Sequence, residues 1–349
     1  MGPLTVSFDP VSGVHSLKVA KRGDTDAVTL HGTKDWLEAL SRDLEVVGPT
    51  EARVIITGET GTGKTTLARA IHLCHKTRGE QRFRRTNVGA LVPELAASQL
   101  FGHVKGAFTG AADDHIGIVE ESNHGTFFMD EVSAASENVQ VMLLTLLETE
   151  NINKVGAGPK HQPTKVNVRF IAATTQPLKV LRESRTFRKE LFYRLAEYHI
   201  AIPPLRERPE EIPVLARAEL LSRQSTHRVP DDSYTALQDI EDAALRHLQA
   251  YRWPGNVREL QSVIRAAVVR SRESPKEKVL RARHIRLPTE GDWSADSSAT
   301  FDEKLSWAEA RDGFQREWIE RALERFGTAA EVGRRFGIDQ KTIKKYRRG

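Results

Sequence analysis

The chain has 349 residues, enough for one large domain and one or two small ones, and 39% apolar with 28% charged residues is ordinary for a globular protein. No run approaches the roughly 18 apolar residues of a membrane span, the N-terminus lacks a secretory pattern, and the single cysteine excludes an internal disulfide, which favours a cytoplasmic protein. Residues 328–349 hold seven Lys or Arg and two Asp or Glu, so the net charge of +5 lies in this segment, as in a short nucleic-acid contact surface or a solvated basic tail.

Strands and helices are predicted to alternate in the middle of the chain. Residues 1–31 show no catalytic pattern and at most a strand or two, and a helix is expected over 36–44. Between the strands, residues 139–147 repeat apolar side chains at helical spacing, with Ser136 available as N-cap. Apolar, β-rich runs predict strands at 53–57, 83–88, 125–129, 168–172 and 198–202. This alternation favours a parallel sheet flanked by helices.

Strand patterns stop after residue 203. Residues 209–287 are predicted to be mostly helical, and 288–300 is rich in small and polar residues, as in a linker. Residues 314–326 carry one apolar helical stripe, a core face or a dimer seam. Residues 328–336 and 339–348 then read as two helices joined by a turn, with Asp339 as N-cap of the second.

A P-loop is indicated at residues 58–65, GETGTGKT. Its glycines let backbone N–H groups surround phosphates, Lys64 reaches the β- and γ-phosphates, and the Thr65 hydroxyl can ligate Mg²⁺. A strand precedes the motif, and residues 64–72 can continue as a helix. This strand–loop–helix setting is the one that a P-loop requires, and it argues against a chance match. The expected nucleotide contacts here are Gly58, Glu59, Thr60, Gly61, Thr62, Gly63, Lys64, Thr65 and Thr66.

Two carboxylates end the apolar strand at 125–129. Asp130 is expected to hold Mg²⁺, and Glu131 to polarise the attacking water, which indicates an ATP hydrolase. An acidic cap between a strand and a helix is the alternative, and it carries little weight beside the P-loop.

A glycine-flanked loop presents Phe108, an aromatic side chain that is unfavourable in water without a partner. Its residues are Gly106, Ala107, Phe108, Thr109, Gly110 and Ala111. This hexapeptide resembles the signature of bacterial enhancer-binding proteins, the AAA+ activators of sigma-54 RNA polymerase, in which the loop grips sigma-54. The resemblance implies an AAA+ α/β core over 32–203 and a helical lid over 204–288.

Other segments resemble the same family in order, from about residue 31 to 288. Residues 98–103 lead into the loop, and 151–164 look like the second substrate-facing loop. Asn87 lies where the family has an asparagine that holds the catalytic glutamate, here Glu131. The resemblance further places Thr174 or Thr175 near the γ-phosphate and makes Arg258 the lid arginine.

Residues 187–195 resemble the segment that carries the arginine fingers of the family. If Arg188 and Arg194 reach a neighbour's site, the protein acts as a ring, expected to be a hexamer, because an arginine supplied in trans is worth ~10³ to 10⁵ in rate. Thr65, Val104 and Thr175 depart from the usual family residues, and the last could weaken γ-phosphate sensing.

The C-terminal residues 301–349 resemble the DNA-binding helix-turn-helix of enhancer-binding proteins, after a linker at 289–300. The expected DNA contacts are Gln340, Lys341, Lys344, Lys345, Arg347 and Arg348. A basic hairpin that only packs is the alternative. Residues 1–31 are too short for a receiver domain, which implies control by a separate regulatory protein or by the amount of protein.

The sequence therefore predicts an α/β AAA+ ATPase with a small all-α DNA-binding domain. Its expected function is to hydrolyse MgATP as a hexamer on enhancer DNA and to remodel the sigma-54 RNA polymerase holoenzyme. Two alternatives stay open: a DNA-binding regulator whose ATPase only sets its oligomeric state, and a general remodelling ATPase such as a helicase loader or chaperone.

Overall fold

The structure is a computed structural model of the chain. It describes residues 4–10, 13–20, 27–159, 161–226, 237–271, 278–288 and 328. The chain divides into two units, 1–287 and 288–349, and each is treated by itself. Three expected features of the second unit lie outside the described residues: the linker, the stripe at 314–326 and the helix-turn-helix. The same holds for the expected DNA contacts Gln340, Lys341, Lys344, Lys345, Arg347 and Arg348.

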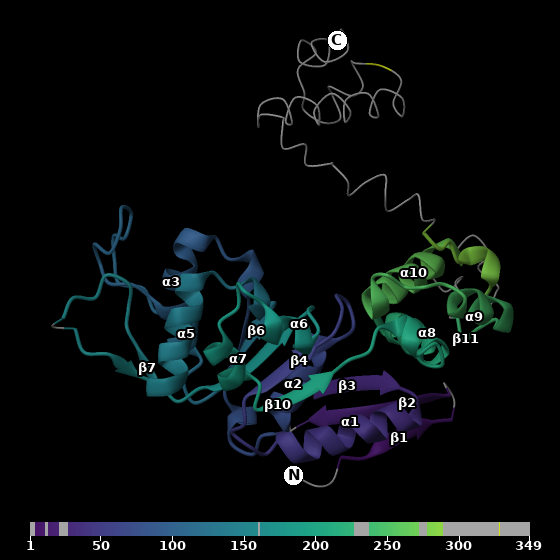
Figure 1. Cartoon of the computed structure of the whole chain (residues 1–349). Coiled ribbons are helices and arrows are strands. Elements are labelled where there is room, and N and C mark those ends of the chain that lie inside the picture. The colour runs from purple at the N-terminus through teal and green to yellow at the C-terminus, as the bar shows by residue number, and fades with distance from the viewer. Residues whose placement is uncertain are drawn as a thin grey trace. The chain divides into compact units, whose positions relative to one another are not determined.

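A five-stranded parallel sheet forms the centre of the first unit (Figure 1). Its order is β10-β4-β9-β6-β5, and every neighbouring pair runs parallel. The carboxyl end of β4, where the P-loop begins, therefore lies inside the sheet beside the end of β9. The predicted strands are all present, with ends shifted by one or two residues: β4 (Val54–Thr57), β5 (Phe83–Asn87), β6 (Thr126–Asp130), β9 (Arg169–Thr174) and β10 (Tyr198–Ala201).

Helices cover both faces of this sheet, and consecutive strand residues enter different cores. Phe127 and Met129 pack in one core, whereas Phe128 between them packs in the other. Because both faces are buried, the strands appear in the sequence as continuous apolar runs. The first core is completed by α3 (Pro93–Phe101), α4 (Ile118–Glu121), α5 (Glu137–Thr149), α6 (Leu178–Glu183) and α7 (Lys189–Leu195), the second by α1 (Lys34–Val47) and α2 (Lys64–Cys74). Ser136 occupies the N-cap position of α5 without a side-chain cap hydrogen bond.

The N-terminal residues build a small antiparallel sheet, β1-β2-β3, that belongs to the core. Its strands are β1 (Val6–Asp9), β2 (Val14–Ala20) and β3 (Ala27–Gly32). Leu17, Val19 and Leu30 are buried in the same cluster as the apolar faces of α1 and α2. The expected boundary between residues 31 and 32 thus falls inside β3, and the three strands form a wall of the first unit. The polar and glycine-rich composition concealed this, because only alternate residues of the strands are buried.

The lid packs three helices around Trp253, whose side chain is fully buried. Its helices are α8 (Glu211–Thr226), α9 (Asp242–Gln249) and α10 (Asn256–Ser271), with a short parallel pair, β11 (Asp239–Ile240) and β12 (Val279–Leu280), that the sequence did not predict. Trp253 Nε1 donates to the carbonyl of Leu248 at 2.8 Å, which satisfies its buried polar atom.

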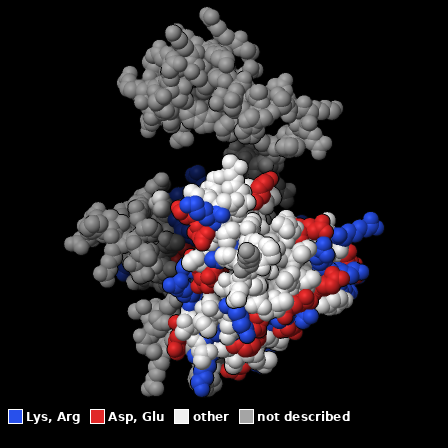
Figure 2. All heavy atoms as spheres, turned by 90° about the vertical axis from the view of Figure 1, so that its left-hand side faces the viewer, with Lys and Arg blue, Asp and Glu red and all other residues white. Residues whose placement is uncertain are grey.

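Basic and acidic side chains are interspersed over the described surface shown in Figure 2, the side of the domain that carries α3, α5 and β7 (Asn151–Ile152). This agrees with the zero net charge of residues 1–327. None of the helices in the described ranges has the length and apolarity needed to cross a bilayer.

Candidate functional site: a P-loop cavity between core and lid

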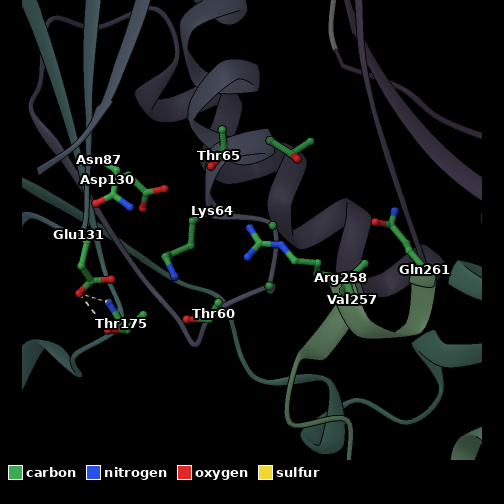
Figure 3. A pocket seen from close by; sticks show the side chains of 13 residues that line it. Thr60, Lys64, Thr65, Asn87, Asp130, Glu131, Thr175, Val257, Arg258 and Gln261 are labelled. Atoms are coloured by element: carbon green, nitrogen blue, oxygen red, sulfur yellow. Dashed lines mark hydrogen bonds between the residues drawn. The ribbon is translucent and has the colours of Figure 1, made fainter. Parts of the chain in front are cut away.

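A cavity of about 320 Å³ opens where the P-loop, the ends of β5, β6 and β9, and the start of α10 meet. Figure 3 shows Lys64 pointing toward the acidic side chains at the strand ends, with Arg258 and Gln261 entering from the lid. The cavity is lined by Thr60, Gly61, Gly63, Lys64, Thr65, Thr66, Asn87, Asp130, Glu131, Thr175, Val257, Arg258 and Gln261.

The P-loop leads from β4 directly into α2, as the sequence predicted. Gly61 and Gly63 adopt positive φ angles of 82° and 105°, a conformation that glycine adopts without strain. A Cβ at Gly61 would collide with the carbonyl of Gly255, so this glycine also lets the lid approach the loop. Lys64 is buried, and burial lowers the pKa of its ammonium, whereas Asp130 and Glu131 raise it.

Several predicted P-loop contacts do not line the cavity. The carbonyl of Gly58 accepts a hydrogen bond from Lys64 Nζ at 2.6 Å, and Thr62 is buried with its hydroxyl on the carbonyl of Glu59. The Glu59 side chain turns to the lid and pairs with Arg206. These residues therefore hold the conformation of the loop and do not face the cavity.

Asp130 and Glu131 reach the cavity from the end of β6. Asp130 faces the Thr65 side of the cavity, and both offer oxygen atoms, the donors that Mg²⁺ prefers (Figure 3). Within the described residues no cluster of three or more His, Cys, Asp or Glu could hold a metal ion. The oxygen donors at the cavity are therefore these two carboxylates, the Thr65 hydroxyl and the phosphates of a nucleotide. Their chemistry fits an Mg²⁺ ion held jointly with a nucleotide.

Of the two threonines at the end of β9, Thr175 lines the cavity and Thr174 does not. Thr174 is fully buried, and its hydroxyl donates to Ser133 Oγ at 3.0 Å. Glu131 Oε1 accepts from the Thr175 hydroxyl at 2.9 Å and from Ser133 Oγ at 2.8 Å. Asn87 lines the same cavity, but the groups that hold Glu131 here are these two hydroxyls, not Asn87 as the family resemblance implied.

The lid contributes more residues than the sequence identified. Arg258 lines the cavity as expected, and its backbone N–H donates to the carbonyl of Gly61. Val257 and Gln261 join it on the first turns of α10. Asn256 is fully buried, and its side-chain amide donates to the carbonyl of Thr60 at 3.0 Å. Helical spacing from Arg258 could have pointed to Gln261, since residues three apart share a face.

A second cavity, of about 180 Å³, shares Gly63, Thr66, Val257 and Gln261 with the first and is therefore continuous with it. Its apolar wall comes from β3, α1 and the lid, with Arg208 stacked over Trp36 at 5.0 Å. Two of its buried polar atoms, His31 Nδ1 and Arg208 Nε, have no hydrogen-bond partner in the part of the chain that the structure describes. No sequence pattern indicated this wall, because His31 and Arg208 are 177 positions apart.

Arg188 and Arg194 lie outside the cavity of their own chain. Arg188 Nη2 pairs with Glu137 at 2.8 Å, and Arg194 Nη2 pairs with Glu148 at 3.3 Å. Both arginine side chains are about half exposed, at 40% and 50%. Ion pairs of this exposure are weak, so both guanidinium groups are free to exchange partners.

The loop at residues 106–111 projects from a base made by two other segments. Val104 N–H donates to the Val155 carbonyl, and Val155 N–H donates to the Gly102 carbonyl, which joins the loop to the second predicted loop, between β7 and β8 (Thr164–Lys165). Phe108 remains 38% exposed and contacts the ring of His103, with 5.0 Å between the ring centroids. Gly106 and Gly110 have positive φ angles, which favours glycine at both ends of the loop.

Residues 30–201 match the family model described as "Sigma-54 interaction domain", and residues 206–297 match "AAA+ ATPase lid domain". The chain is 41% identical over 260 residues to "DNA-binding transcriptional activator HyfR" of Escherichia coli (strain K12), covering 74% of this chain and 37% of that protein. It is 38% identical over 291 residues to "Anaerobic nitric oxide reductase transcription regulator NorR" of Citrobacter koseri, covering 81% and 55%.

Among solved structures, NtrX from Brucella abortus in complex with ADP aligns with a TM-score of 0.65 at 28% identity, over 92% of this chain and 68% of that one. NtrX in complex with ATP gives the same TM-score. The chain spans about half the length of the curated relatives it matches, from 37% of HyfR to 57% of one NorR. The matched ranges include the P-loop, both carboxylates, the loop at 106–111 and Arg258. The core and lid described above are therefore a P-loop AAA+ ATPase domain of the sigma-54 interaction family, whose relatives are transcription activators.

Proposed function

We propose that the protein is a sigma-54-dependent transcription activator. It hydrolyses MgATP as a ring oligomer, remodels sigma-54 RNA polymerase through residues 106–111, and binds upstream enhancer DNA through residues 301–349. The observation that carries the proposal is a single cavity, inside a sigma-54 interaction domain, that gathers Lys64, Thr65, Asp130 and Glu131.

In this proposal the phosphates of ATP lie along the P-loop. Lys64 exchanges its hydrogen bonds to the Gly58 and Glu59 carbonyls for phosphate oxygens, and the backbone N–H groups at the start of α2 face the same anion. Glu131 accepts a hydrogen bond from the attacking water, and Arg258 adds positive charge from the lid. Thr65 and Asp130 would hold Mg²⁺, which supplies charge neutralisation at the phosphates.

The second cavity fits the nucleoside part of ATP. It is apolar, adjoins Gly63 and Thr66 of the P-loop helix, and offers His31 Nδ1 and the Arg208 Nε–H as polar groups. A purine presents both a large apolar face and hydrogen-bonding edges, which are the two features of this wall.

The exposed Arg188 and Arg194 support assembly into a ring. They cannot act on a nucleotide in their own chain's cavity, because neither lines it. A second copy that placed them near the γ-phosphate would complete the site. Hydrolysis in each subunit would then depend on the position of its neighbour, which is what a remodelling motor needs.

The loop at 106–111 supports sigma-54 as the target. Its Phe108 is exposed, and its base is tied to the Val155 segment. None of its residues lines the cavity, so a change at its tip is expected to leave hydrolysis intact.

The test measures open-complex formation by sigma-54 polymerase on a sigma-54 promoter with the full chain, using ATP or a non-hydrolysable analogue. Opening is expected only with ATP. Thr109→Ala should abolish opening while keeping ATPase activity, and Thr145→Ala, an exposed threonine on α5, should keep both. ATPase activity without opening would favour a regulator whose ATPase only sets its oligomeric state.

A further inference from the structure

A chain of hydroxyl groups connects the end of β9 to Glu131. The Thr174 hydroxyl donates to Ser133 Oγ at 3.0 Å, and Ser133 Oγ donates to Glu131 Oε1 at 2.8 Å. The Thr175 hydroxyl donates to the same oxygen at 2.9 Å, and Thr175 N–H lies 3.3 Å from it. We propose that Ser133, together with Thr175, is a positioning residue that holds Glu131 for ATP hydrolysis, an inference that rests on the function proposed above.

The backbone around Glu131 is arranged for this contact. Glu131 has φ 54° and ψ 51°, a left-handed conformation that is unfavourable for a residue with a Cβ atom. The next residues form a single 3₁₀ turn, Val132–Ala134, closed by the Ala134 N–H on the Glu131 carbonyl at 3.1 Å. This turn brings the hydroxyl of Ser133 back to the carboxylate two residues earlier. Strained backbone of this kind persists where the surrounding structure fixes it, and it is concentrated at functional sites.

The hydrogen bonds from Ser133 and Thr175 leave one carboxylate oxygen of Glu131 for catalysis. Oε1 receives the bonds from Ser133 and Thr175, so Oε2 is the oxygen that remains for a water in the cavity. The side chain of Glu131 has three rotatable bonds and could otherwise turn. Since the carboxylate is a rigid planar group, holding Oε1 by hydrogen bonds from two directions restricts where Oε2 can point. A general base must lie within hydrogen-bond reach of the proton it takes, and this geometry decides its efficiency.

These contacts are anchored beside the strand that leads into the P-loop. Thr174 is buried at the carboxyl end of β9, which pairs with β4, the strand that leads into the P-loop. The Gly58 N–H donates to the Thr174 carbonyl at 3.2 Å, so Thr174 contacts both the first P-loop residue and Ser133. Ser133 is thus the link between the P-loop strand and the catalytic carboxylate.

The experiment measures steady-state ATP hydrolysis and, separately, the Kd of a fluorescent ADP analogue with the full chain. Ser133→Ala should lower kcat about tenfold with Kd unchanged, a small part of the ~10² to 10⁴ that a positioned base supplies. Ser133→Thr, which keeps the hydroxyl, should restore most of kcat. The matched control is Ser136→Ala, three residues on, whose side chain makes no cap hydrogen bond and which should behave as wild type.

A second measurement separates positioning from structural damage. In a Glu131→Gln background, adding Ser133→Ala should not lower the residual rate further, because the carboxylate that the hydroxyl positions is already absent. Wild-type kcat in Ser133→Ala, or equal further losses in both backgrounds, would overturn the inference. Absence of hydrolysis by the wild-type protein would instead contradict the proposed function, so the two failures are distinguishable.

Discussion

Arg206 and Glu59 form a two-pronged ion pair that joins the lid to the P-loop. Arg206 Nη1 donates to Glu59 Oε2 and Nη2 donates to Oε1, both at 2.7 Å. The Asn256 amide reaches the same carboxylate at 3.2 Å. The hydrogen bond from Arg206 lowers the pKa of Glu59, so the pair is charged over the physiological range. The side chain of Glu59, a P-loop residue, therefore binds the lid and does not face the phosphate site.

Breaking this pair should loosen the lid over the nucleotide. We expect Arg206→Ala to weaken ATP binding by about threefold to tenfold, the range of one charge-assisted contact. The fold should persist, because both side chains are exposed and surface pairs contribute little to stability. Nucleotide titration checks this, with Arg246→Ala on the exposed side of α9 as control. Equal affinities for the two variants would show that the pair does not position the lid.

The buried lysine predicts a dependence of ATP affinity on pH. Burial lowers the pKa of Lys64 from its ordinary value of 10.5. The protonated form binds phosphate, so affinity should fall as pH rises through this lowered pKa, earlier than an ordinary lysine would allow. Nucleotide titrations between about pH 7 and about pH 10 measure it. Lys64→Arg, whatever its absolute affinity, should lose this alkaline decline because a guanidinium stays protonated.

The lid is also anchored to the core by a buried carboxylate. Glu211 is 1% exposed, and its oxygens accept from the Thr33 N–H at 3.0 Å and the Thr33 hydroxyl at 2.6 Å. Glu211→Ala would leave these donors unpaired, so we expect a loss of about 1 to 3 kcal/mol in the free energy of unfolding. Urea denaturation measures it, and Glu210→Ala, the exposed neighbour, is the control. A stability equal to that control would show that the contact is not formed in solution.

The proposed role of Arg188 and Arg194 as arginine fingers predicts complementation between inactive variants. Arg188→Ala or Arg194→Ala should each lower ATPase activity ~10³-fold or more if the group acts in trans. Mixing either variant with Glu131→Gln should restore part of the activity, because some interfaces then combine an intact cavity with an intact arginine. Arg182→Ala, an exposed arginine paired with its neighbour Glu183, is expected to stay active. Mixtures no more active than their components would place the arginines in another role.

Local patterns in the sequence were enough to identify the parts of the site that lie on consecutive residues. The P-loop and the strand that ends in Asp130 and Glu131 could be identified because each lies in a short run whose spacing reflects one strand or one helix turn. Arg258 was identified only by the family resemblance of the residues around it. The parallel sheet was predicted on the same basis and is confirmed, since strands buried on both faces stand out as apolar runs. The family resemblance of the loop at 106–111 also depended on consecutive residues.

The contacts between distant segments could be seen only in the folded chain. It turned Glu59 toward the lid, placed Thr175 and not Thr174 in the cavity, and brought Ser133 onto Glu131. Strands β1, β2 and β3 form a wall of the domain because their few buried side chains meet α1 and α2, a relationship that local composition does not encode. Spacing along the chain reports the geometry of one element, whereas hydrogen bonds and packing between elements depend on strand order, register and the approach of the lid.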